Sequence, residues 1–224
     1  LLGEENWYRT RVNLLLASFR NKFLEYVPQL IEREEIEIQS LLVDFASVHP
    51  SLLAKSYLEK QVNSHHKDIA YRSTRVLGET YPETVNTPTY LSNSDHVIRN
   101  ITIQSLTNWP VKNVIDNLIP LLVHEKCAET TVATLSEITR KKPGYVEYLI
   151  DCFENEKSPQ VRDGLANVLS NRIEYILVKL LTDKSGKMQD LVTGIVMSGK
   201  LTGVISFLNR NKNIELENAI LETL

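Results

Sequence analysis

A nine-residue pattern of apolar side chains recurs along this chain about every 30 residues, and it constrains the fold more than any other feature. Its clearest copy is Val161–Leu169, where apolar residues at the first, fifth, eighth and ninth places share one face of a helix. Copies begin at residues 36, 69, 98, 127, 161, 188 and 216, so neighbours are 27 to 34 residues apart. Repeats of this length are typical of stacked helix pairs, because one pair cannot bury its apolar face alone. The pattern therefore predicts an all-α fold, an α-solenoid in which each copy is the second helix of a pair.

Prolines mark the starts of the helical segments between these copies. Proline is tolerated in the first turn of a helix, where its missing N–H leaves no hydrogen bond unmade. Ser158-Pro159 predicts a capping serine followed by a first-turn proline. The other prolines interpreted in this way are Pro50, Pro82, Pro110 and Pro143.

The N-terminal segment has a helical pattern of its own. Apolar spacing predicts one helix from Glu4 to Tyr26, which Pro28 then interrupts. We assign residues 1–27 to a helix that caps the stack or links it to an upstream segment, and residues 28–224 to the stack. The chain begins at Leu1 without Met, so we expect a fragment; Leu1-Leu2 fits the tail of a removed membrane anchor or a cloning boundary. Leu216–Leu224 ends without a polar cap, which predicts that the chain continues or meets another chain there.

Composition limits the classes of partner. The 25 basic and 28 acidic residues give a net charge of −3, and neither half of the chain is a basic block, so we expect no nucleic-acid partner. No apolar run approaches the roughly 20 residues that cross a bilayer, so we expect no transmembrane segment here. Two cysteines do not make a disulfide framework, and they favour a reducing, cytoplasmic location, which includes the cytoplasmic face of a membrane.

Two stretches resemble HEAT repeats, in particular the short bacterial kind called phycobilisome-lyase-like. They are Leu91–Arg99 (LSNSDHVIR) and Ser158–Ala166 (SPQVRDGLA), with a loop followed by a hydrophobic residue and Arg. The resemblance covers about residues 28–224 and implies a bacterial source and about six antiparallel helix pairs in a right-handed stack. It also implies a scaffold or adaptor for protein–protein interaction, with the second helices lining a concave side.

The resemblance is incomplete in one respect. Regular HEAT arrays have a ladder between a loop Asp and an Arg six residues later. Only one of the corresponding pairs keeps opposite charges here, so we expect an irregular ladder and structural roles for the two arginines. The pairs are Asn93 with Arg99, Glu156 with Arg162, and Asp183 with Gln189.

Catalytic and cofactor motifs are absent from the sequence. There is no glycine-rich phosphate loop, no Gly-x-Ser-x-Gly, no Cys-x-x-Cys and no His-Glu-x-x-His. HEAT-like di-iron hydroxylases need several His-Glu pairs, whereas this chain has only His124-Glu125. We therefore expect a non-enzyme without metal or cofactor. The alternatives are a HEAT-like nucleic-acid enzyme of the DNA glycosylase type, or a regulatory domain of a membrane-anchored protein.

The candidate binding residues occupy the third place of the repeated pattern, which points away from the buried face. Three carboxylates one repeat apart would attract a basic segment of a protein or peptide. The alternative is an ordinary solvated helix face. The third-place residues are Tyr71, Asn100, Glu129, Asp163 and Asp190, and the seventh-place residues beside them are Arg75, Gln104, Ala133, Asn167 and Gly194.

Overall fold

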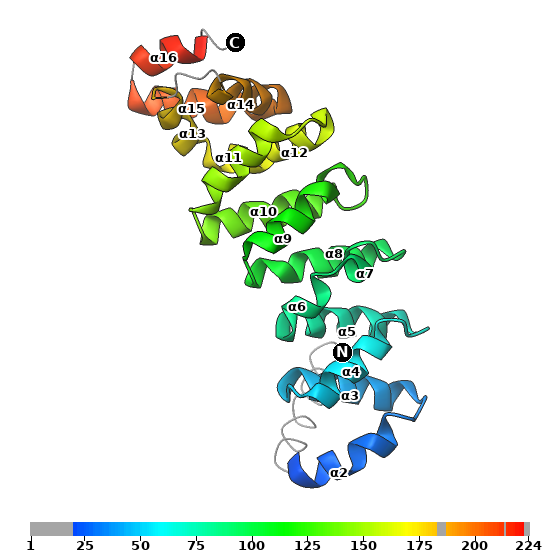
Figure 1. The fold of residues 1–224 in the computed structure, drawn as a ribbon. Helices are drawn as coiled ribbons and strands as arrows, with labels where there is room; N and C mark the ends of the chain where they lie inside the picture. The colour runs from blue at the N-terminus through cyan, green and yellow to red at the C-terminus, as the bar shows by residue number, and fades with distance from the viewer. Residues whose placement is uncertain (1–19, 183–186, 213, 222–224) are drawn as a thin grey trace, which may run out of the picture. The chain divides into compact units, whose positions relative to one another are not determined.

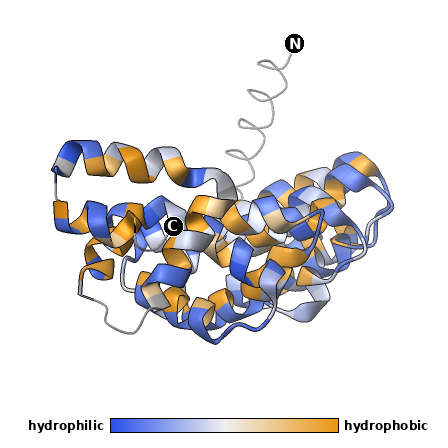
Figure 2. Ribbon diagram, turned by 90° about the horizontal axis from the view of Figure 1, so that it is seen from above, coloured by the Kyte–Doolittle hydropathy of each residue, from blue (hydrophilic) through white to orange (hydrophobic). Residues whose placement is uncertain are grey.

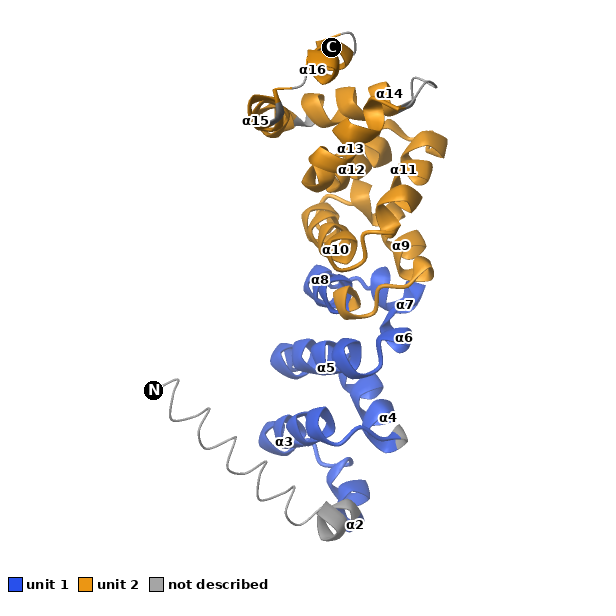
Figure 3. Cartoon of the chain, turned by 90° about the vertical axis from the view of Figure 1, so that its left-hand side faces the viewer, with its two compact units in different colours: residues 1–105 blue, residues 106–224 orange. Residues whose placement is uncertain are grey.

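Every regular element that the structure describes is a helix. The computed structural model describes residues 20–182, 187–212 and 214–221 (Figure 1). Apolar and polar residues alternate along these helices, as an amphipathic pattern requires (Figure 2). The all-α prediction is confirmed for this part of the chain. The chain divides into two compact units, residues 1–105 and residues 106–224 (Figure 3).

The first unit consists of helices in two layers. Figure 3 shows α3, α5 and α8 on one side of this unit and α4, α6 and α7 on the other. Helix α5 packs on both α3 and α8, and it also contacts α4 and α6. The helices are α2 (Arg20–Leu30), α3 (Ile36–Val48), α4 (Leu52–Gln61), α5 (Lys67–Thr80), α6 (Pro82–Val85), α7 (Pro88–Leu91) and α8 (His96–Ser105).

Close approach of α5 and α8 depends on a glycine. A Cβ atom added to Gly78 would lie 2.0 Å from Ser105 Oγ and 2.3 Å from Ser105 Cβ. Two backbones can pack this closely only where one side chain is a hydrogen atom. The hydroxyl of Ser105 donates to the carbonyl of Thr102, so it is satisfied within its own helix.

The second unit is built around α12. This helix packs on η2, α10, α11 and α14, and α13 packs on α14, α15 and α16. The elements are the 3₁₀ turn η1 (Leu106–Asn108), α9 (Lys112–Leu118), the 3₁₀ turn η2 (Ile119–Val123), α10 (Ala128–Lys141), α11 (Tyr145–Asn155), α12 (Pro159–Leu169), the 3₁₀ turn η3 (Ser170–Arg172), α13 (Ile173–Leu180), α14 (Lys187–Ile195), the π-helical turn η4 (Val196–Lys200), α15 (Leu201–Asn211) and α16 (Ile214–Leu221).

The start of α12 follows the sequence prediction. Ser158 is the N-cap, its hydroxyl accepts from the Val161 amide, and Pro159 is the first helical residue. Val161, Leu165, Val168 and Leu169 are all buried, with Leu165 fully so. The predicted helix and its buried face are confirmed for this copy.

The other copies of the pattern also lie on helices. Copies at 69, 98, 127 and 188 bury at least three of their four pattern places, and the copy at 216 buries both places that the structure describes. The copy at 36 was placed in the wrong register. Ile36 is 40% exposed, and the buried residues of α3 are Leu42, Val43, Phe45 and Ala46. The first turn of α3 follows a charged connector and has little to pack against, so its apolar residue stays in solvent.

The predicted break at Pro28 is also wrong. Helix α2 continues through Pro28 to Leu30. A proline inside a helix costs one backbone hydrogen bond, and here only two residues follow before the helix ends, so the disturbance is small. The predicted helix from Glu4 otherwise lies outside the described residues up to residue 19.

Candidate functional site

The five candidate binding residues divide between the two units. Tyr71 on α5 and Asn100 on α8 belong to the first unit, and both are half-buried. The Tyr71 hydroxyl lies 3.3 Å from Asp95 Oδ2, so it also takes part in an internal contact. Glu129, Asp163 and Asp190 lie on α10, α12 and α14 of the second unit, and all three are exposed.

A cleft in the second unit brings two of these carboxylates together. It is open to solvent, has a volume of about 650 Å³, and lies over α12, α14 and the turn η4. A cleft of this size is within the range that holds small ligands or a short peptide segment. Its lining residues are Phe153, Pro159, Arg162, Asp163, Asp190, Thr193, Gly194 and Met197. We call it the α12–α14 cleft.

Arg162 is the cation of this cleft. Its guanidinium stacks on the Phe153 ring, with Cζ 4.5 Å from the ring centroid. Its nearest carboxylate is Asp190, whose Oδ2 lies 3.6 Å from a terminal nitrogen, which is too long for a hydrogen bond. The Nε atom of Arg162 is buried, and it has no hydrogen-bond acceptor among the described residues.

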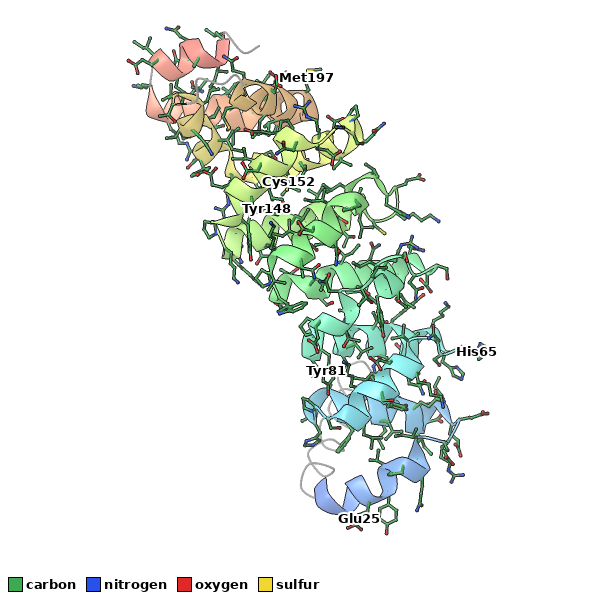
Figure 4. The ribbon with its side chains drawn as sticks, in the orientation of Figure 1. Glu25, His65, Tyr81, Tyr148, Cys152 and Met197 are labelled. Atoms are coloured by element: carbon green, nitrogen blue, oxygen red, sulfur yellow. The ribbon has the colours of Figure 1, made fainter. Side chains whose placement is uncertain are left out.

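Met197 forms one edge of the cleft. Its side chain is 82% exposed, the largest value among the exposed large apolar residues of the described chain. Figure 4 shows it at the surface of the second unit. The π-helical turn η4 carries Met197, and the turn ends the run of α14 because Gly199 takes a φ of +82°. This left-handed conformation suits glycine and would strain most other residues.

Gly194 forms part of the floor. A Cβ atom added there would approach Ala166 Cβ at 3.4 Å and Phe153 at 3.8 Å, so a larger side chain would fill the space between α14 and α12. The seventh-place row of the repeat pattern contained Gly194, and the structure places it in the same cleft as Asp163 and Asp190. The sequence pattern thus located three lining residues, but it assigned no binding role to Phe153, Arg162 or Met197.

The arginine ladder is irregular in the structure. Arg99 donates to the backbone carbonyls of Asn93 and Ser94 in its own loop. Glu156 accepts from the amides of Lys157 and Ser158 and makes no contact with Arg162, which turns instead toward Asp190. The third predicted pair includes Asp183, which lies outside the described residues.

Side chains of α9, α11 and α13 in the second unit form a separate network. Tyr148 on α11 donates to Asp116 on α9, and Figure 4 shows Tyr148 next to Cys152. Tyr175 and Lys179 on α13 both donate to Glu147 on α11. Donation by Lys179, followed by that of Tyr175, lowers the pKa of Glu147 below its ordinary value. These contacts join successive helices, and the groups that make them already have partners.

The cysteines do not have the surroundings of an activated nucleophile. Cys127 is buried at the start of α10. Burial raises the pKa of the half-buried Cys152 thiol, whereas a reactive cysteine needs a lowered value. No group of three or more metal-ligating side chains comes together within residues 20–182, 187–212 and 214–221.

The short basic run at the end of α10 takes part in structural contacts. Arg140 is paired with Glu137, Lys141 lies 3.1 Å from Asn108 Oδ1, and Lys142 donates to the carbonyl of Pro110. Cations near a helix C-terminus are also favoured by the helix dipole. The run therefore does not form a free phosphate-binding patch.

No family model matches this chain, and no curated protein matches it significantly. Among the described helices, none combines the length and the apolar character that a membrane crossing needs.

Proposed function

We propose that this chain is a non-catalytic binding scaffold of HEAT-like helix pairs, and that its α12–α14 cleft holds a positively charged segment of a protein or peptide. One observation carries the proposal. Asp163 and Asp190, which the repeat spacing placed on one face, line the same open cleft of about 650 Å³. Carboxylates in a concave site attract cationic segments and speed their association.

Repetition supports the scaffold part of the proposal. In the second unit α12 packs on α10 and on α14, and these three helices carry consecutive copies of the same pattern. Helix pairs that contact mainly their sequence neighbours form solenoids, whose extended faces bind other chains. We propose that the helix pairs of both units follow this plan, with the second helices on the binding side. A cytoplasmic adaptor role is consistent with free cysteines.

The charge of the cleft argues for a basic partner and against nucleic acid. Its ionisable lining consists of two carboxylates and one arginine, so the lining carries a net negative charge. Glu129 is a further exposed carboxylate on α10, which packs on α12, and we propose that it faces the same side as the cleft. Phosphates would meet repulsion there, whereas lysine or arginine side chains would find acceptors.

A peptide array tests the proposal. Basic, acidic and neutral peptides of equal length are presented to the full chain at low salt, and binding is then measured in solution by fluorescence anisotropy. We expect selective binding of basic peptides. The triple variant Glu129→Gln/Asp163→Asn/Asp190→Asn should bind about 3- to 150-fold more weakly, since each exposed ion pair contributes about 0.2–1 kcal/mol.

A second triple variant controls for net charge. Glu79→Gln/Asp151→Asn/Glu215→Gln removes the same charge from exposed positions that do not line the cleft. It should bind like the wild type. Equal binding by the cleft triple at low salt, or selective binding of acidic peptides or DNA, would show that the proposal is wrong.

A further inference from the structure

The α12–α14 cleft offers three kinds of contact at once. Asp163 and Asp190 provide acceptors, the Arg162 guanidinium provides donors, and Met197 provides an exposed apolar surface. An occupant recognised only by charge would need the carboxylates alone. The arginine and the methionine therefore limit which basic segment fits.

Arg162 offers hydrogen-bond donors to the occupant. Its side chain is 36% exposed, and the nearest carboxylate oxygen, Asp190 Oδ2, lies 3.6 Å from a terminal nitrogen, which is too long for a hydrogen bond. An oxygen of the occupant can accept from these terminal nitrogens, and hydrogen bonds from a charged donor are stronger than neutral ones. A carboxylate of the occupant would also face Asp163 and Asp190, which would repel it. A neutral backbone carbonyl satisfies the donor without that repulsion.

A free backbone carbonyl as the acceptor favours one conformation of the occupant. The carbonyls inside an α-helix already accept hydrogen bonds from the amides four residues later. An extended segment leaves its carbonyls available, and successive side chains point to opposite sides. An extended segment can therefore present a carbonyl to Arg162 while its side chains reach the rest of the cleft.

Met197 supplies the apolar part of the site. A single exposed apolar residue is ordinary on a protein surface. Met197 differs because it stands at the edge of a cleft whose wall includes the Phe153 ring, on the turn η4 in which Gly199 takes a left-handed conformation. Methionine is flexible and polarizable, so it adapts to apolar side chains of different shapes.

We infer that the α12–α14 cleft recognises an extended peptide segment in which a lysine or arginine lies near an apolar residue. The basic side chain pairs with Asp163 and Asp190, a backbone carbonyl accepts from Arg162, and the apolar side chain covers Met197. This inference rests on the proposed function, because it specifies the segment that the same cleft holds.

A positional peptide library tests the inference on the full chain. One position is fixed as Arg or Lys, and every other position is varied through all residues. We expect enrichment of large apolar residues at a constant spacing from the basic residue. Replacing the apolar residue of the best peptide by Ser should weaken binding roughly tenfold, as expected when partial burial of an apolar side chain is lost.

Matched protein variants assign this preference to the cleft. Met197→Gln should remove the apolar preference, weaken the best peptide roughly tenfold and keep the basic preference. Ile205→Gln is the control, because Ile205 is also exposed but lies on α15 outside the cleft lining, and it should change nothing. Arg162→Lys keeps the charge but loses the planar guanidinium and its stack on Phe153, so it should also weaken the best peptide.

Three results would overturn the inference. If basic peptides bind without an apolar preference and Met197→Gln binds them like the wild type, the inference is wrong, whereas the proposed function still holds. A stapled helical form of the best peptide that binds as tightly as the extended form would exclude the extended mode. Enrichment of acidic residues would show that Arg162 holds an anion, and it would overturn the proposed function as well.

Discussion

The contact between Gly78 on α5 and Ser105 on α8 makes a sharp test of the packing in the first unit. In Gly78→Ala the new Cβ would lie 2.3 Å from Ser105 Cβ, and an ordinary contact is at least 3.4 Å. Both atoms are fixed to backbones, so neither can rotate away and the helices must separate by about 1 Å. We place the cost at the upper end of usual overpacking, about 3 kcal/mol. Alanine regains about 1 kcal/mol of helix propensity. The net loss of unfolding free energy is about 2 kcal/mol.

A second substitution reverses the sign of this effect. Ser105→Gly removes both clashing atoms, after which the nearest side-chain atom to an alanine at 78 is Val85 Cγ2 at 3.7 Å. Gly78→Ala should therefore destabilise the wild type but stabilise Ser105→Gly by up to about 1 kcal/mol. The assay is urea unfolding followed by circular dichroism, with hydrogen exchange of α5 and α8. An equal effect of Gly78→Ala in both backgrounds would refute the close packing of these helices.

Further predictions concern the second unit. Leu165→Ala should lower the free energy of unfolding by about 2–5 kcal/mol, because the leucine is fully buried. Faster hydrogen exchange should concentrate in α10, α12 and α14. Faster exchange throughout the chain would contradict the idea that each helix packs on its sequence neighbours alone. Gly199→Ala should lower the free energy of unfolding, measured by thermal unfolding, by about 1–2 kcal/mol, because Gly199 has a positive φ. Gly144→Ala is the control and should be neutral or stabilising, because Gly144 has a right-handed backbone and open space around it. Donation by Lys179 lowers the pKa of Glu147 below its ordinary value of 4.5. The ionised pair therefore stabilises the fold fully above pH 4.5, and this stabilisation is lost as the pH falls through the lowered pKa of Glu147. Glu147→Gln should therefore be less stable than the wild type at pH 7, with the difference vanishing in acid; a difference that persists at low pH would exclude the ionised pair as its cause.

Much of the helical structure was predictable because it depends on local spacing. The four pattern residues of Val161–Leu169 are buried as predicted, and the Ser158-Pro159 helix start has the predicted cap. Pro28 and the copy at 36 were wrong because both lie at a helix end. Helix α2 ends two residues after Pro28, so the proline disturbs little, and local spacing did not reveal that the first turn of α3 stays in solvent.

The candidate site was predictable only in part. The third-place row supplied Asp163 and Asp190, since residues at equivalent places of neighbouring repeats face the same way. Arg162 was expected to be structural, and Glu156 was the corresponding ladder position in a ladder expected to be irregular. The structure places Arg162 on the Phe153 ring and toward Asp190, which depends on how closely α11, α12 and α14 pack.

The sequence by itself determined the all-helical character of the described residues, the starts of most helices and the buried face of most pattern copies, because these depend on spacing, caps and prolines within a few residues. Tertiary structure decided the rest. The α12–α14 cleft forms where α12 and α14 pack together, Met197 lies on the turn η4 that follows α14, and Arg162 stacks on the Phe153 ring of α11. Contacts between residues distant in sequence are not encoded in any local pattern, so the site emerged only when the helices were packed together.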